Sequence, residues 1–262
     1  MLPIRKYPRT PHLEGSRLQH GDHDLEAVPF ARIRGRFVVV EEKVDGANCG
    51  ISFDAGGRLL LQSRGHYLTG GPRERHFDLL KQWATCHQAA LREVLGERYV
   101  MYGEWMYAKH TCFYDLLPHY FLEFDVLDQE SGDFLSTARR RELLRGLPVA
   151  SVKVLWEGQP GSLTELTRWV GPSHFKSERW QEALAEQAWS SGVRPERASR
   201  ETDGSSEMEG LYLKVEEERQ VVARLKYVRS SFLNAILDSG THWLDRPIVP
   251  NLLAPGVDLW SP

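Results

Sequence analysis

Two periods of apolar residues run through the chain, and each period predicts one type of element. Short apolar or alternating runs bounded by turn residues predict strands, because one or both faces of a strand are buried. The polar turn 54–57 separates two such runs, so this part of the chain predicts an antiparallel meander. The expected strands are 37–40, 49–53, 58–63, 99–105, 120–127 and 152–156, followed by a hairpin of 211–215 and 221–228.

Apolar positions at three- and four-residue intervals predict helices elsewhere. The longest such pattern is 74–95, which Gly96 ends. Ser136 is the expected cap of a second helix, and Ser162 opens a capping box with Glu165. The other expected helices are 137–144, a short one after Ser162, 175–189 and 231–238. The segment 190–207 has almost no large apolar residues and is predicted to be a mobile loop.

Composition narrows the class of protein. The 262 residues are 41% hydrophobic and 26% charged, which is typical of a globular chain with a sizeable core. No apolar run is long enough to span a bilayer, and the first residues lack the apolar core of a signal peptide. We therefore expect a cytoplasmic protein without a membrane partner. Three scattered cysteines argue against a disulfide framework or a cysteine-based zinc site.

The charge balance limits how the chain could bind nucleic acid. The formal net charge is −3, so attraction to phosphate must come from local patches. Two basic clusters stand out, Thr137–Arg141 and the looser set Arg194, Arg197 and Arg200. For each cluster alone, a solvated surface is the favoured interpretation.

The segment Glu42-Lys43-Val44-Asp45-Gly46 joins the end of a predicted strand to a turn. A lysine attacks phosphorus only as the free amine, and burial or a neighbouring cation can supply that form near neutral pH. A nucleophile at the end of a strand is held rigidly and faces a cleft. Taken alone, however, the pattern is weak evidence, because a chain of this length contains it by chance about one time in twenty.

Five further segments follow in one order: Gln62–Gly65, Tyr102–Trp105, Phe121–Asp125, Glu209–Lys214 and Ala223–Tyr227. With them the chain resembles the covalent nucleotidyltransferases, which comprise DNA ligases, RNA ligases and mRNA capping enzymes. It is most similar to the RNA ligase 2-like branch. The series from Glu42 to Lys226 covers about two-thirds of the chain.

The resemblance implies a role for each matched residue at the nucleotide. Lys43 would be the nucleophile that takes up AMP. Glu42 would read the adenine edge and Phe124 would stack on the base. The ribose hydroxyls would bind Glu104, whose carboxylate accepts hydrogen bonds from a diol. Arg64 would contact the nucleotide or the terminal phosphate.

The last two motifs imply the groups that neutralise phosphate charge. Glu209 would place a divalent metal, Mg²⁺ or Mn²⁺, and would count with Lys43 and Lys226 among the catalytic residues. Lys226 and Arg224 would hold the α-phosphate, although the family often has lysine where this chain has Arg224. Three more motif residues are expected to contact the nucleotide: Asp45, Gly46 and Lys214.

The fold that the resemblance implies is α+β. It is a nucleotidyltransferase domain, an ATP-grasp-like ligase adenylation domain, with antiparallel sheets flanked by helices and the nucleotide between them. Residues 1–230 would form this domain, and 231–262 a short helix and a Pro-rich tail packed on it. The residues after Lys226 are too few for the five-stranded OB barrel that follows in DNA ligases and capping enzymes.

The expected activity is ATP-dependent joining of 5′-phosphate and 3′-hydroxyl RNA ends through a lysyl-AMP intermediate. NAD⁺ is disfavoured as donor, because the stretch before Lys43 is short for a nicotinamide-binding domain. A minimal DNA nick-sealing ligase and a non-catalytic nucleotide- or RNA-end-binding module are the alternatives. Joint presence of Lys43, Glu104, Glu209 and Lys226 favours an enzyme. We expect a monomer that acts on RNA ends, with DNA ends as the alternative, and an end-healing polynucleotide kinase-phosphatase as partner.

Overall fold

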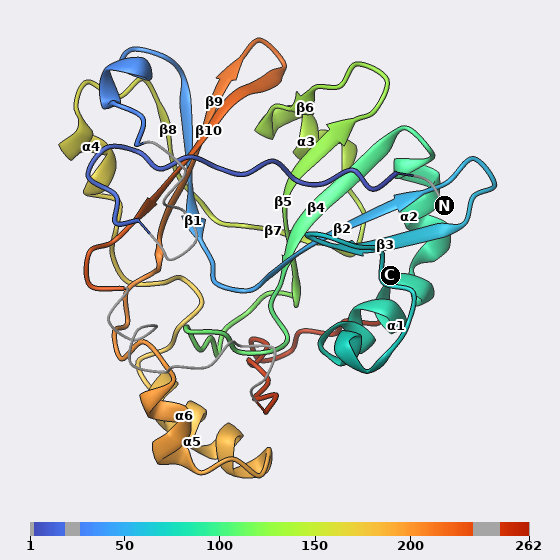
Figure 1. Ribbon diagram of the computed structural model, residues 1–262, viewed down its shortest axis with the longest axis vertical. Coiled ribbons are helices and arrows are strands. Elements are labelled where there is room, and N and C mark those ends of the chain that lie inside the picture. The colour runs from blue at the N-terminus through green and yellow to red at the C-terminus, as the bar shows by residue number, and fades with distance from the viewer. Residues whose placement is uncertain (1–2, 19–26, 233–246, 262) are drawn as a thin grey trace.

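The computed structural model describes residues 3–18, 27–232 and 247–261. Within them one hydrogen-bonded sheet runs in the order β3-β2-β4-β5-β6-β10-β9-β1-β8, with β7 beside β5 (Figure 1). Every pair is antiparallel except β5 with β7. The strands are β1 Val38–Lys43, β2 Ala47–Phe53, β3 Leu59–Ser63, β4 Tyr99–Trp105, β5 Phe121–Asp128, β6 Phe134–Leu135, β7 Ala150–Ser151, β8 Val154–Gly158, β9 Gly210–Glu217 and β10 Gln220–Val228.

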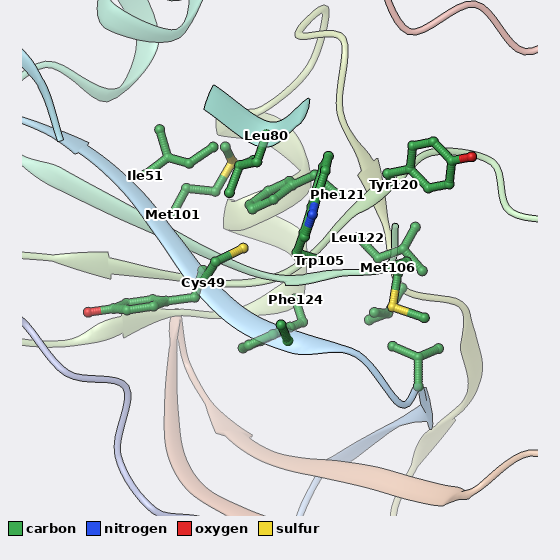
Figure 2. Close-up of a cluster of buried hydrophobic side chains, with 14 of the residues drawn as sticks. Cys49, Ile51, Leu80, Met101, Trp105, Met106, Tyr120, Phe121, Leu122 and Phe124 are labelled. Carbon is green, nitrogen blue, oxygen red and sulfur yellow. The ribbon is translucent and has the colours of Figure 1, made fainter. Parts of the chain in front are cut away.

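Consecutive strands β1 and β2 lie far apart in this sheet. β1 pairs with β8 and β9, whereas β2 pairs with β3 and β4. The turn 44–46 therefore crosses from one half of the sheet to the other. Each half has its own apolar core, one built on β2, β4 and β5 (Figure 2) and the other on β1, β9 and β10. Lys43 ends β1 at the crossing point.

Helices flank the sheet unevenly. They are α1 Asp78–Cys86, α2 Gln88–Leu95, α3 Thr137–Leu143, α4 Leu163–Thr167, α5 Trp180–Ser190 and α6 Pro195–Arg200, with 3-10 turns at Phe30–Arg32 and Pro72–Phe77. α1 and α2 pack their buried residues, among them Leu80, Trp83 and Leu91, into the core of the β2–β4–β5 half. α5 and α6 lie together at the bottom of Figure 1, away from the sheet.

The sequence prediction of the elements is largely confirmed, with three corrections. The single helix expected over 74–95 is wrong: a 3-10 turn precedes two helices that meet at His87, whose φ of −96° and ψ of 12° interrupt the α-helix. The strand expected over 152–156 begins only at Val154, as β8, and the two-residue β7 precedes it at Ala150–Ser151. The loop expected over 190–207 contains α6, because Ala198 and Val193 bury a small apolar face against α5.

The caps of the short helices differ from each other. At α4 the Ser162 hydroxyl accepts a hydrogen bond from the Glu165 amide at 3.2 Å, as the capping box predicts. At α3 the Ser136 side chain makes no such bond. Glu216 of β9 accepts from the Thr137 amide and hydroxyl instead, at 2.8 and 2.6 Å. A carboxylate from β9 therefore caps α3 in place of Ser136. The sequence around Ser136 could not indicate this partner, because Glu216 is distant in the chain.

The predicted tail is described only in part. Most of the helix expected over 231–238 lies outside the described residues. Residues 247–261 lie alongside the segment that connects β4 and β5, with β-bridges from Pro250 to Ala108 and from Leu253 to Leu117. None of the described helices is long and apolar enough to cross a bilayer.

Candidate active site

A cleft opens where the two halves of the sheet meet. Its lining comes from strands of both halves and from the N-terminal segment: Tyr7, Thr10, Glu41, Glu42, Lys43, Val44, Asn48, Arg64, Glu104, Phe124, Val152, Tyr212 and Lys226. Six predicted site residues are in this lining, namely Glu42, Lys43, Arg64, Glu104, Phe124 and Lys226. The other five, Asp45, Gly46, Glu209, Lys214 and Arg224, are not.

Lys43 and Glu209 form an ion pair at the edge of the cleft. The Lys43 Nζ lies 2.6 Å from the Glu209 Oε2, and the side chains are 21% and 2% exposed. The register of the sheet causes this contact, because Lys43 pairs with Gly210 across β1 and β9. Gly210 is required there, since a Cβ atom would fall 1.9 Å from the Tyr227 carbonyl oxygen.

The charge states of Lys43 and Glu104 are coupled. Burial alone lowers the pKa of Lys43, but Glu209, Glu104 and Asp45 outweigh burial and raise it above its usual value. Burial raises the pKa of Glu104 to about 8, with Asp45 and Glu209 adding to the effect and Lys43 and Arg64 opposing it. At neutral pH the cleft therefore holds a charged lysine and a carboxyl group that is largely protonated.

The turn after Lys43 rests on the segment between β4 and β5. The Asp45 Oδ2 accepts hydrogen bonds from the amides of Thr111 and Cys112 at 2.6 and 2.8 Å. Its own amide donates to the Tyr114 hydroxyl at 2.9 Å. A Cβ atom on Gly46 would lie 2.7 Å from the Met106 sulfur, so only glycine fits. In this structure Asp45 and Gly46 shape the turn, and their contact with nucleotide stays a prediction.

Three aromatic residues form one end of the cleft. The Phe124 ring lies 6.2 Å from that of Tyr212, at 39°, and 5.1 Å from that of Tyr7, edge to face. The Tyr7 hydroxyl donates to Asp125 at 2.6 Å and lies 2.7 Å from the Tyr212 hydroxyl, which also contacts Thr10. Sequence analysis missed Tyr7, Thr10 and Tyr212. Of these three residues, only Tyr212 lies inside a matched motif, Glu209–Lys214.

Lys214 and Arg224 do not line the cleft and belong to a buried ion network that includes Glu41 of its lining. Lys214 lies 2.9 Å from the Glu41 Oε2 and donates to the Phe124 carbonyl. Arg224 lies 2.7 Å from Asp125, with its guanidinium 3.8 Å from the Phe134 ring centroid. Arg140, expected in a solvated cluster, is fully buried and bridges Glu41 at 2.7 Å and Glu123 at 3.1 Å, so that expectation is wrong for it.

Glu42, Lys226 and Arg64 are positioned by different means. Glu42 accepts hydrogen bonds from the Ser173 hydroxyl at 2.5 Å and from the His174 amide at 3.0 Å, and burial raises its pKa. The Lys226 backbone is held by the N-terminal segment, whose Pro11 carbonyl accepts from it at 2.9 Å. Figure 1 shows this segment crossing the sheet. Arg64 is exposed at the mouth of the cleft.

The Glu209 carboxylate suits a hard cation whose other ligands come from the substrate phosphates and water. Among the described residues no group of three or more Asp, Glu, His or Cys side chains gathers as a preformed metal site. Glu209 nevertheless presents a carboxylate beside Lys43, and Mg²⁺ typically binds through one or two carboxylates together with substrate phosphates. The geometry thus fits a metal that enters with the nucleotide.

A model of RNA ligases matches residues 36–228, which includes every predicted site residue. The chain belongs to the RNA ligase family. Solved structures of Naegleria gruberi RNA ligase share its α+β fold. The structure with AMP and Mn has a TM-score of 0.54 at 16% identity and covers 90% of this chain and 60% of that one.

A second solved structure of the Naegleria ligase, with PPi, has a TM-score of 0.51 at 17% identity and covers 79% of this chain and 53% of that one. The chain thus spans a little over half the length of these ligases. Among curated proteins, none matches the chain. At these identities the likeness shows the fold, an antiparallel sheet flanked by helices as the sequence predicted.

Proposed function

We propose that the chain is an ATP-dependent RNA ligase that joins a 5′-phosphate to a 3′-hydroxyl through AMP bound to Lys43. One observation carries the proposal: Lys43 stands at the seam of the two half-sheets, in a cleft with Glu104 and Lys226 and 2.6 Å from Glu209. Family membership supports joining of RNA, and the solved Naegleria ligase structures with ATP and Mn, with AMP and Mn, and with PPi support the cofactors.

The proposed reaction has three phosphoryl-type transfers. Lys43, after losing a proton, attacks the α-phosphorus of ATP, and the bond to pyrophosphate breaks. The 5′-phosphate of an RNA end then displaces Lys43 and takes up the AMP. Finally a 3′-hydroxyl attacks the activated phosphate and releases AMP. Such transfers depend mainly on positioning and on neutralisation of charge.

The aromatic end and the cationic end of the cleft would orient ATP. Phe124 and Tyr212 would hold the base, because a ring can stack on it while the nearby hydroxyls contact its polar edge. Glu104 would bind the ribose. Lys226 and Arg64 would lie along the phosphates, where their charges offset those of the oxygens. This orientation would align Lys43 with the leaving pyrophosphate.

Arg224 and Lys214 have a different part in the proposal. Both are held by buried carboxylates, those of Glu41 and Asp125, so we propose that they fix the strands carrying Phe124 and Lys226. Glu42 would act likewise on the segment 173–174, which its carboxylate holds. A divalent metal held by Glu209 would supply positive charge to the phosphate oxygens. Within the chain, Glu209 also fixes the Lys43 amine until nucleotide binds.

The substrate can be tested by sealing of labelled ends. A nicked RNA strand, a nicked DNA strand and a single-stranded RNA, each with a 5′-phosphate, would be offered separately with ATP and Mg²⁺, with Lys43→Ala as control. The proposal expects sealing of RNA by the wild type only. Preferential sealing of DNA would instead support a minimal DNA ligase. An end-healing kinase-phosphatase would be required for ends that lack the 5′-phosphate, and sealing of such ends by the chain alone would contradict that partner.

A further inference from the structure

Residues 247–261 run alongside the segment that connects β4 and β5, beyond the part matched by the family model. Backbone hydrogen bonds join the two segments at five places, between 2.8 and 3.1 Å: Lys109 to Val249, Asn251 to Tyr107, Leu252 to Tyr114, Leu117 to Leu252, and Ala254 to Leu117. This pairing makes the tail a continuous support for the segment 106–120.

Asn251 is the centre of this support. Its side chain is fully buried, and its Oδ1 accepts from the Tyr114 amide at 2.9 Å while its Nδ2 donates to the Met106 carbonyl at 2.6 Å. Its backbone donates to the Tyr107 carbonyl and accepts from the Tyr120 hydroxyl, at 2.8 and 2.9 Å. The amide orientation follows from these partners, because only this one satisfies both side-chain atoms.

The segment that Asn251 holds is the same one on which the nucleophile turn rests. The Tyr114 amide donates to the Asn251 side chain, and the Tyr114 hydroxyl accepts a hydrogen bond from the Asp45 amide. Met106, whose carbonyl Asn251 caps, packs its sulfur against Gly46. Two short paths therefore run from the tail to the turn that follows Lys43. No matched motif contains Asn251.

We infer that Asn251 is a positioning residue for the attack of Lys43 on ATP, an inference that rests on the proposed function. Loss of its amide would leave a buried N–H and a buried carbonyl without partners. The segment 106–120 would then move to regain them, and the turn 44–46 would move with it. An in-line displacement depends steeply on such shifts, since a misplacement of about 1 Å can cost about 100-fold in rate.

The test separates attack on ATP from the later joining step. Wild type, Asn251→Ala and Tyr114→Phe would be compared in single-turnover formation of lysyl-AMP across ATP concentrations. The same proteins would then join an RNA with a chemically pre-adenylylated 5′ end, a step without attack by Lys43 on ATP. Asp258→Ala is the matched control, because Asp258 lies in the same segment and bonds only locally to Trp260 and Ser261 in the described part of the chain.

The inference expects both variants to form lysyl-AMP about 10- to 100-fold more slowly at saturating ATP, with joining of the pre-adenylylated end within about threefold of wild type. Asp258→Ala should match wild type in both steps. Equal loss in both steps, with lower thermal stability, would overturn the inference and leave a purely structural strap. An unchanged rate of lysyl-AMP formation in both variants would also overturn it. Failure of the wild type itself to take up AMP would refute the proposed function instead, and the inference with it.

Discussion

The Nζ atom of Lys43 lies 2.6 Å from the Oε2 atom of the buried Glu209 carboxylate. This pair holds the lysine in its charged form, whereas attack on phosphorus needs the free amine. Lys43, the proposed nucleophile, is therefore restrained while it is paired with Glu209. In the proposed mechanism, Glu209 would hold a metal that enters with the nucleotide, and Lys43 would then lose the partner that keeps it charged.

Replacement of Glu209 by Gln should separate its effect on the pKa of Lys43 from its effect on the rate of lysyl-AMP formation. Removal of the negative charge lowers the pKa of Lys43, so modification of Lys43 by an amine-reactive reagent should begin at lower pH than in the wild type. Formation of lysyl-AMP should nevertheless fall by about 10²- to 10³-fold, because the charge that assists the transition state is lost. Glu207→Gln, at an exposed neighbour, is the control for both measurements. An unchanged pH dependence of modification would contradict the role of the ion pair.

Glu104 should make stability depend on pH. Its pKa rises from 4.5 to about 8 on folding, so the folded state binds a proton more tightly than the unfolded state and stability is lost as the pH rises through that range. Glu104→Gln does not titrate. Its Tm should therefore exceed that of the wild type by an amount that grows from about pH 4.5 to about pH 8 and then levels off.

Above about pH 8, where the Glu104 side chain is ionised, the same variant should bind ATP more weakly than the wild type, since a neutral amide is a weaker acceptor for ribose hydroxyls than a carboxylate. Glu93→Gln on the exposed face of α2 should show neither effect. If the difference in Tm does not change with pH, burial of Glu104 has no energetic consequence and the assignment is wrong.

Arg140 should be the most costly arginine of its cluster to replace. It bridges Glu41 and Glu123 at full burial, so Arg140→Met leaves two buried carboxylates without their cation. We expect a loss of about 3–5 kcal/mol in the free energy of unfolding, measured by denaturant titration. Arg141→Met, at an exposed position of α3, should stay within about 0.5 kcal/mol of the wild type. Equal losses in the two variants would show that the network does not stabilise the fold.

Gly46 tests how closely the nucleophile turn packs. A Cβ atom there would meet the Met106 sulfur, the Trp105 carbonyl and the Glu104 Cγ at 2.7–2.9 Å. Gly46→Ala should therefore lower stability by about 1–3 kcal/mol and slow lysyl-AMP formation more than it weakens ATP binding. Gly171→Ala, where a Cβ atom meets nothing within 4 Å, is the control. Wild-type rates in Gly46→Ala would show that the turn adjusts freely.

Sequence alone predicted those parts of the fold that depend on local pattern. The hairpin of β9 and β10 follows from two alternating runs around a polar turn, and the structure confirms it. The helix break at His87 was not predictable, because the apolar spacing continues across it. Helix α6 was missed because its burial is small and depends on α5, so its own residues carry little apolar signal.

In the candidate site, too, the sequence predicted what depends on local motifs and not what depends on contacts between distant parts of the chain. Ordered motifs located Lys43, Glu104, Phe124 and Lys226, which the structure brings to one cleft. The contribution of Tyr7 could not be predicted, since its partner Asp125 lies 118 residues away. Lys214 was assigned to the nucleotide from its motif alone, and only the three-dimensional network shows which carboxylate holds it. The type of a residue indicates which chemistry it can perform. The pairing of strands across the sheet determines whether its charged group faces the cleft or a buried partner.

The central claim is covalent capture of AMP by Lys43, and incubation with α-labelled ATP and Mg²⁺ or Mn²⁺ tests it most directly. Wild type, Lys43→Ala and Lys6→Ala, an exposed lysine of the N-terminal segment, would be denatured and examined for bound label. The account predicts label on the wild type and on Lys6→Ala and none on Lys43→Ala. Folded wild type that takes up no label with either metal, or label that persists on Lys43→Ala, would contradict it.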